Sequence, residues 1–159
     1  YGITLGAAAL AVAFFLFLRF VVFDVYVVGG ASMEPGLAPG TVVLVLRAAF
    51  AGDAAPGEVV CAGSAGQKIV KRVAAAGPAV VAWKNGAVYI NGTVVDRFRH
   101  RPQLDIPGSC RVAPDALFLL GDNMNASSDS RATGAVPRSA IRGRVVWAVF
   151  PFSLFGEVR

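Results

Sequence analysis

Residues 58–73 read EVVCAGSAGQKIVKRV and contain two Val-rich runs, EVVCA at 58–62 and KIVKRV at 68–73. Similar runs recur elsewhere after Asp24: VYVV at 25–28, TVVLVL at 41–46, AVYI at 87–90, TVV at 93–95, ALFLL at 116–120 and RVVWAVF at 144–150. The runs are rich in β-branched or aromatic residues, and segments containing Gly and Pro separate them. Many short runs of this kind predict an antiparallel β domain.

Turn signals refine this β prediction. Asn85-Gly86 and Asn91-Gly92 flank AVYI, and an Asn-Gly pair beside such a run is a strong hairpin signal. A segment rich in Arg and Pro, residues 96–114, has no clear period and is typical of a surface excursion. We therefore expect a mostly β fold over residues 24–159, with a small inserted cap segment at about residues 84–114.

The N-terminal segment is one long apolar run rather than a series of short ones. Residues 3–23 read ITLGAAALAVAFFLFLRFVVF, and Arg19 is the one charge among them. At about 1.5 Å per residue this run can cross a hydrocarbon core of about 30 Å, and a terminal arginine can extend to the headgroups. A cleaved secretory signal, with its shorter apolar run, and a buried core helix are the alternatives. We expect residues 1–23 to form one transmembrane anchor.

Composition narrows the possible functions. The 159 residues suit one compact domain plus an appendage, and 55% of them are hydrophobic. The net charge of +5 comes from scattered basic residues rather than a stripe, which argues against a nucleic-acid partner. One histidine, His100, and two distant cysteines, Cys61 and Cys110, do not form a zinc pattern, so we expect neither a metal nor a cofactor. The two cysteines could pair or remain separate thiols.

Three segments carry candidate chemistry. The first, residues 29–35, reads GGASMEP and places two glycines before Ser32. Glycine lets the backbone approach a substrate closely, which suits an exposed nucleophile beside an oxyanion-binding amide. The same residues are also typical of an ordinary turn without a catalytic role.

The second segment is KIVKRV. In a strand, alternate side chains share a face, so Lys71 lies with Ile69 and Val73 while Lys68 and Arg72 face the other way. An ammonium group on an apolar face loses hydration, its pKa falls, and its neutral form can act as a base for a serine hydroxyl. A solvated lysine at a sheet edge is the alternative interpretation.

The third segment, residues 121–131, reads GDNMNASSDSR directly after the apolar run ALFLL. An Asx-rich loop or a calcium loop would also be polar, but Arg131 adds a cation where a calcium ion would be poorly placed.

Together the three segments resemble three boxes of the bacterial type I signal peptidases, which are Ser/Lys-dyad serine proteases. The nucleophile motif Ser-Met-x-Pro-Thr-Leu corresponds to SMEPGL at 32–37, the Lys-Arg-Val box to residues 71–73, and the Gly-Asp-Asn…Ser-x-Asp-Ser-Arg box to residues 121–131. Gly36 replaces the motif threonine, and residues 74–79 replace the usual Gly-x-Pro-Gly-Asp continuation.

The resemblance implies a role for each matching residue. Ser32 would be the nucleophile and Lys71 its general base. Ser127 matches the position whose hydroxyl orients the lysine amine, and Asp129 and Arg131 match a structural pair. The oxyanion hole would use the Ser32 backbone N–H and the position of Gly30, where many relatives carry a hydroxyl residue.

The resemblance also implies a membrane-bound endopeptidase that removes signal peptides from exported preproteins through an acyl-enzyme intermediate. Its partners would be signal peptides with small residues before the cut and membrane lipid. The expected location is the bacterial cytoplasmic membrane, with a single-pass anchor and the catalytic domain on the outer, periplasmic side. A Ser/Lys peptidase with another client, and a catalytically silent relative that assists assembly, are the rival readings.

Overall fold

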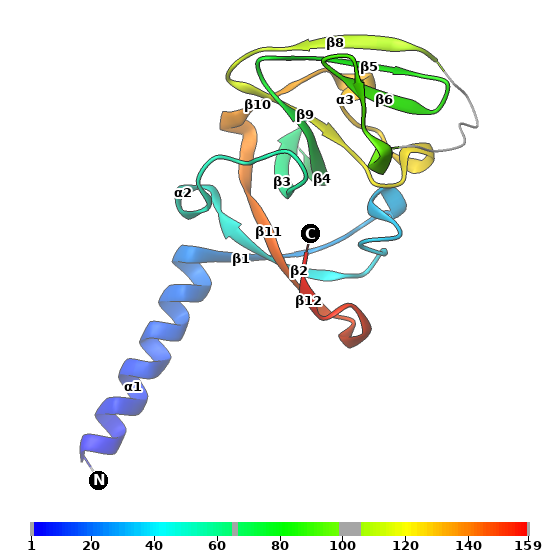
Figure 1. Cartoon of the computed structure of the whole chain (residues 1–159). Helices are drawn as coiled ribbons and strands as arrows, with labels where there is room; N and C mark the ends of the chain where they lie inside the picture. The colour runs from blue at the N-terminus through cyan, green and yellow to red at the C-terminus, as the bar shows by residue number, and fades with distance from the viewer. Residues whose placement is uncertain (1, 65–66, 99–105, 159) are drawn as a thin grey trace.

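The computed structural model describes residues 2–64, 67–98 and 106–158. Helix α1 (Gly2–Phe17) extends away from the rest of the chain (Figure 1) and is followed by a π-helical turn, η1 (Leu18–Val22). The segment expected to be one helix to Phe23 therefore changes at Leu18, and Phe23 begins strand β1 in an extended conformation. Among the described residues, no helix has the length and apolar character needed to cross a membrane.

The larger sheet contains most of the predicted strands. Its path is β1-β2-β11-β3-β4-β9-β10, with β12 added to β11, and all its pairs are antiparallel. The members are β1 (Phe23–Val27), β2 (Val42–Arg47), β3 (Val59–Ser64), β4 (Gln67–Ala76), β9 (Ala116–Leu120), β10 (Val136–Pro137), β11 (Ile141–Phe150) and β12 (Gly156–Glu157). The mostly β, antiparallel prediction is confirmed.

A second sheet of four strands lies over one end of the first (Figure 1). Its order is β7-β6-β5-β8, formed by β7 (Thr93–Val94), β6 (Ala87–Ile90), β5 (Ala79–Lys84) and β8 (Gly108–Val112). Asn85 and Asn91 have positive φ in the turns before and after β6, as an Asn-Gly hairpin requires. Strands β5 and β8 lie outside the predicted runs, so this cap sheet begins earlier than expected, at Ala79.

Short helical turns connect the strands. They are η2 (Ala31–Met33), α2 (Ala48–Ala51), η3 (Asp96–Phe98), η4 (Met124–Ala126), α3 (Ser130–Thr133), η5 (Arg138–Ala140) and η6 (Phe152–Leu154). Turn η2 lies in the first candidate segment, η4 lies in the third, and α3 begins within the third.

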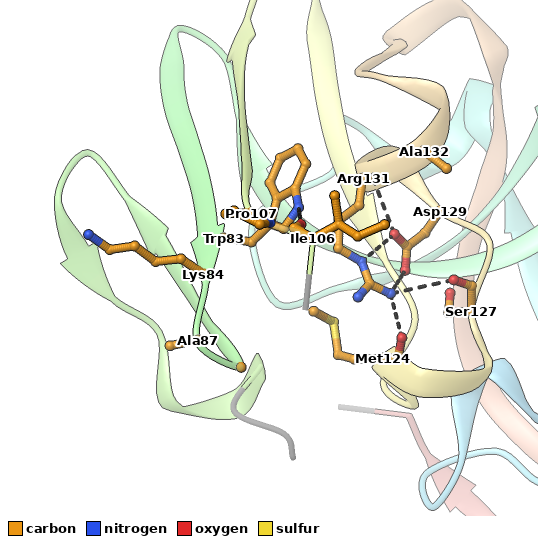
Figure 2. Close-up of a pocket in the computed structure, with 11 residues that line it drawn as sticks. Trp83, Lys84, Ala87, Ile106, Pro107, Met124, Ser127, Asp129, Arg131 and Ala132 are labelled. Atoms are coloured by element: carbon orange, nitrogen blue, oxygen red, sulfur yellow. Dashed lines mark hydrogen bonds and ion pairs between the residues drawn. The ribbon is translucent and has the colours of Figure 1, made fainter. Parts of the chain in front are cut away.

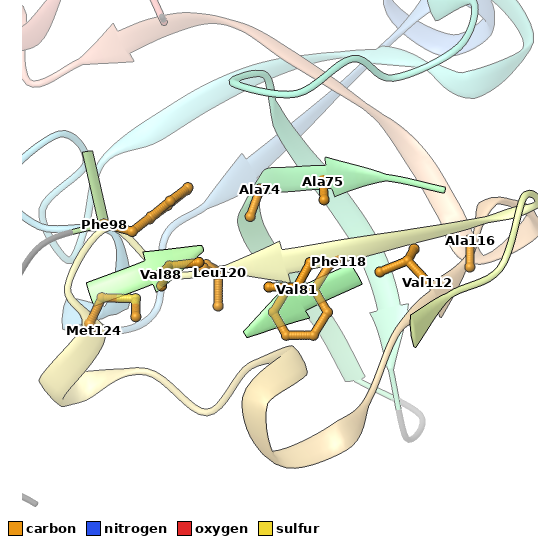
Figure 3. Packing of buried hydrophobic residues seen from close by; sticks show 10 residues of the cluster. All are labelled: Ala74, Ala75, Val81, Val88, Phe98, Val112, Ala116, Phe118, Leu120 and Met124. Atoms are coloured by element: carbon orange, nitrogen blue, oxygen red, sulfur yellow. The ribbon is translucent and has the colours of Figure 1, made fainter. Parts of the chain in front are cut away.

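Three apolar clusters form the core. One lies between the sheets, where Phe118 and Leu120 of β9 contact Val81 and Val88 of the cap (Figure 3). The second contains Met33, Val43 and Cys61, and the third contains Val60, Val73 and Leu119 of the larger sheet. Cys110 belongs to the cap sheet, and both cysteines are free thiols. The second cluster matters for function because it holds the segment that carries Ser32.

Candidate functional site

Ser32 lies in the turn η2, between β1 and β2. The next residue, Met33, is completely buried, and Leu37 is 2% exposed, so two apolar side chains fix the turn to the core. The Leu37 N–H also donates to the Met33 carbonyl at 2.8 Å. Because the residues around it are anchored, the half-buried Ser32 side chain is held in one place.

Lys71 reaches Ser32 from the middle of β4. Its Nζ lies 2.6 Å from the Ser32 Oγ, although the residues are 39 positions apart in sequence. On one side Lys71 pairs with Val60 of β3. On the other side, pairing with β9 begins only at Arg72, so within the described chain the β4 edge at residues 67–71 is open.

The environment of Lys71 favours its neutral form. The residue is 5% exposed, and burial lowers the pKa of its ammonium group, while the Asp129 carboxylate acts in the opposite direction. The net shift is downward. A neutral amine has a lone pair, so at a separation of 2.6 Å it can accept the Ser32 hydroxyl proton.

The third segment is fixed by Asp129. Its fully buried side chain accepts from the Gly121 N–H at 3.1 Å, and the Arg131 guanidinium donates to both of its oxygens at 2.9 and 3.0 Å. The same guanidinium donates to the Met124 carbonyl at 2.6 Å (Figure 2). Asp129 and Arg131 therefore stabilise a loop that lies directly beside Lys71.

Ser127 and Gly121 show how close this loop comes to Ser32. The Ser127 Oγ is buried and has no hydrogen-bond partner in this structure. A Cβ added to Gly121 would lie 2.5 Å from the Ser32 carbonyl oxygen and 2.6 Å from the Ser127 Cβ, so only glycine fits between them. The Asn123 N–H donates to the same Ser32 carbonyl at 3.0 Å. The motif alone predicts no role for Gly121.

A buried ion pair was also missed. The Arg72 guanidinium donates to both carboxylate oxygens of Asp122 at 2.7 Å and to the Gly57 carbonyl at 2.6 Å. The two charged side chains are only 3% and 11% exposed. Both residues belong to motif segments, but strand alternation gave only the face of Arg72 and not its partner. The pair joins β4 to the third segment next to Lys71.

Gly30 leaves space beside the dyad. Its backbone is extended, with φ −145° and ψ 171°, and a Cβ added there would meet no atom within 4 Å. Nothing in its surroundings therefore excludes a side chain. Within residues 2–64, 67–98 and 106–158, no group of three or more His, Cys, Asp or Glu residues is placed to hold a metal ion.

Known proteins resemble this chain in both sequence and fold. The family model "Signal peptidase, peptidase S26" matches residues 3–150. "Signal peptidase I" of Bacillus caldolyticus is 33% identical over 87% of this chain and 85% of its own length. "Signal peptidase IB" of Staphylococcus aureus (strain COL) is 32% identical over 92% of this chain and 89% of its own length.

The crystal structure of a signal peptidase I from Enterococcus faecalis has the same fold, with a TM-score of 0.52 and 22% identity. The match covers 60% of this chain and 99% of the solved one. The family model spans nearly the whole chain, including all three motif segments. The chain therefore belongs to the signal peptidase family, peptidase S26.

Proposed function

We propose that this chain is a membrane-bound serine endopeptidase that removes signal peptides with a Ser32/Lys71 dyad. The observation that carries the proposal is the 2.6 Å contact between the Ser32 Oγ and the Nζ of a buried lysine whose pKa is lowered. A serine hydroxyl is a weak nucleophile unless an adjacent base takes its proton, and Lys71 is that base.

The reaction proceeds in two halves. Ser32 Oγ attacks the scissile carbonyl as its proton passes to Lys71 Nζ, and the Ser32 backbone N–H donates to the developing oxyanion. Collapse of the tetrahedral intermediate breaks the peptide bond, and Lys71 returns the proton to the leaving amine. Lys71 then activates a water that hydrolyses the Ser32 ester. Asp129 with Arg131 holds the loop that carries Ser127 beside Lys71. The expected hydrogen bond from Ser127 to the lysine amine is not formed in this structure, because the buried Ser127 Oγ has no partner.

The open edge of β4 suggests how substrate binds. An extended peptide can add to an unpaired strand edge through its backbone, while shallow pockets select its side chains. Residues 67–71 offer such an edge, which ends at the proposed base. A signal peptide has small residues in an Ala-x-Ala-like pattern before its cut, and this pattern suits an extended segment lying close to the sheet.

Membrane attachment is assigned to the N-terminal segment. The apolar side chains of α1 are exposed, with Leu10, Phe14 and Phe15 at 74%, 63% and 68%. Helix α1 packs against neither sheet (Figure 1), so its apolar surface is left for lipid. The proposed site is the bacterial cytoplasmic membrane, with α1 and η1 as the anchor and the sheets on the outer side.

The proposal is tested with the full chain in a neutral detergent and a preprotein that carries one Ala-x-Ala site. Mass spectrometry of the products should show a single cut after the second alanine. The control preprotein has a bulky residue at that alanine and should remain intact. Cutting at unrelated sites, or equal cutting of both preproteins, would contradict the assigned substrate.

The pH dependence of cleavage follows from the lowered pKa of Lys71. The base acts only when neutral, and its neutral fraction rises until the pH passes its pKa. We expect kcat/KM to rise with pH through the neutral range and to level off below the ordinary lysine pKa of about 10.4. A pH–rate profile for one preprotein checks this expectation, and a decrease from pH 6 to 9 would contradict it.

Gly30→Ser should raise activity. The open space at Gly30 admits a side chain, and a hydroxyl there would add a second oxyanion donor to the Ser32 N–H. Since losing one such donor costs about 10²–10³ in rate, a donor on an unoptimised turn should raise kcat by about tenfold. Gly30→Ala, which adds a Cβ without a donor, is the matched control and should leave kcat unchanged. Equal rates for both variants would mean that no donor acts from this position.

A further inference from the structure

A cavity of about 500 Å³ lies where the helical N-terminal segment joins the larger sheet. We name it the junction pocket, and its lining residues are Asp24, Tyr26, Arg47, Ala48, Ala49, Lys68, Ile141 and Arg142. Neither Ser32 nor Lys71 lines it. Three of its side chains are cationic and one is a carboxylate, so the pocket carries a net positive charge.

The single carboxylate does not satisfy these cations. The Asp24 carboxylate is shared between Arg19 at 3.8 Å and Arg47 at 3.9 Å, both long contacts. The Nε of Arg47 is buried and has no hydrogen-bond partner. In the described part of the chain, Lys68 and Arg142 form no ion pair. The pocket therefore has an unpaired hydrogen-bond donor and positive charge that no carboxylate neutralises.

The neutral groups of the pocket do not offset this charge. The Tyr26 hydroxyl donates to Asp24 at 3.4 Å, and burial raises the pKa of Tyr26 to about 12, so the hydroxyl stays protonated. The Lys68 ammonium lies 4.9 Å from the centre of the Tyr26 ring. A ligand that fits must be an anion that accepts several hydrogen bonds. Phosphate oxygens match this requirement and the forked geometry of arginine.

The position of the pocket indicates where such a phosphate comes from. Residues 18–22 connect α1 to β1, and Phe20 among them is 61% exposed. Phe50, which follows the two alanines of the pocket wall, is 50% exposed. Exposed aromatic side chains beside cations at the base of an apolar helix are typical of a headgroup-level surface.

We propose that the junction pocket binds the phosphate of an anionic phospholipid headgroup, through Arg47, Lys68 and Arg142. This inference rests on the membrane attachment in the proposed function. It adds a lipid site outside the peptidase site, which would set the height and tilt of the sheet above the bilayer. An acidic segment of a substrate could bind the same cations. The pocket adjoins the C-terminal end of the α1–η1 segment, however, where lipid headgroups are the nearest anions.

The test uses the full chain in a neutral detergent and three probes: dihexanoylphosphatidylglycerol, dihexanoylphosphatidylcholine and inorganic phosphate. Calorimetric titration should show saturable binding of phosphatidylglycerol alone. Because a cation near a lipid surface contributes about 1 kcal/mol, Arg142→Gln should weaken this binding about fivefold and the Arg142→Gln/Lys68→Gln pair about 25-fold. Arg142→Lys, which keeps the charge, should retain most of it.

Arg111→Gln is the matched control, because it removes an exposed arginine from the cap sheet. It should leave phosphatidylglycerol binding unchanged. Equal binding of phosphatidylcholine, equal binding of inorganic phosphate, or no effect of Arg142→Gln would each overturn the proposal. The Ser32→Ala chain should bind phosphatidylglycerol as the unmodified chain does. A chain that binds this lipid but cuts no preprotein would refute the proposed function alone, and one that cuts but binds no lipid would refute the pocket alone.

Discussion

Lys71→Met should lower kcat for preprotein cleavage by about 10⁴–10⁶-fold, the loss seen when a serine peptidase loses its nucleophile or base. Methionine has a similar length and no charge, so it fits the buried site on β4, and the Ser32 hydroxyl that loses its partner is only half-buried. Ser32→Ala should cause a similar loss. Because nucleophile and base act as one unit, the double variant should be no slower than either single one. Single-turnover cleavage of one preprotein measures all three.

Lys84→Met provides the control for this experiment. Lys84 is exposed at the end of β5 in the cap sheet, and its Nζ lies over the Tyr89 ring at 5.6 Å. Its removal should leave kcat unchanged. The fold of Lys71→Met should also survive, because burial disfavours the charged form of the replaced group. A Lys71→Met chain that is folded and cleaves at the normal rate would eliminate the dyad.

Asp122→Ala should lower the free energy of unfolding by about 3–5 kcal/mol. The substitution leaves the Arg72 guanidinium, which is 3% exposed, without its two short bonds to carboxylate. Arginine cannot shed its charge, so the full desolvation cost remains. Urea unfolding followed by tryptophan fluorescence should show a lower midpoint with an unchanged slope.

Two further variants test whether the loss of stability in Asp122→Ala comes from the buried ion pair. Asp53→Ala breaks a 3.6 Å ion pair with Arg138 in which the carboxylate side chain is 94% exposed, and it should not shift the midpoint measurably. Arg72→Met/Asp122→Leu removes both charges and should be more stable than Asp122→Ala. If Asp53→Ala and Asp122→Ala are equally stable, the buried pair does not stabilise the fold.

The sequence predicts the local structure of this chain better than its long-range arrangement. Val-rich runs and Asn-Gly turns indicate strands and hairpins because both signals act within a few residues. The division into two sheets depends on pairs far apart in sequence, such as Val81 with Cys110. The change at Leu18 was also missed, because the apolar letters continue unchanged into β1.

For the candidate site too, the sequence predicts local features better than contacts between distant residues. Alternation along a strand separates Lys71 from Lys68 and Arg72, since side chains of a strand point alternately to its two faces. It cannot show that Arg72 meets Asp122, which lies 50 residues away. Nor can it show that Gly121 leaves room for the contact between the third segment and Ser32, because that contact depends on packing in three dimensions.

The two halves of strand β4 differ in whether their edge is paired with another strand. This difference limits the affinity that a strand-like inhibitor can gain from backbone pairing. Beyond Lys71 its edge is occupied by β9, whereas residues 67–71 are unpaired on that side. At about 3.4 Å per residue the free edge is about 17 Å long. A peptidomimetic that pairs with it can use the backbone of only about five residues, so further affinity must come from its side chains or from a covalent group at the proposed nucleophile, Ser32. Short warhead-bearing strands are therefore better leads for this chain than long peptide analogues.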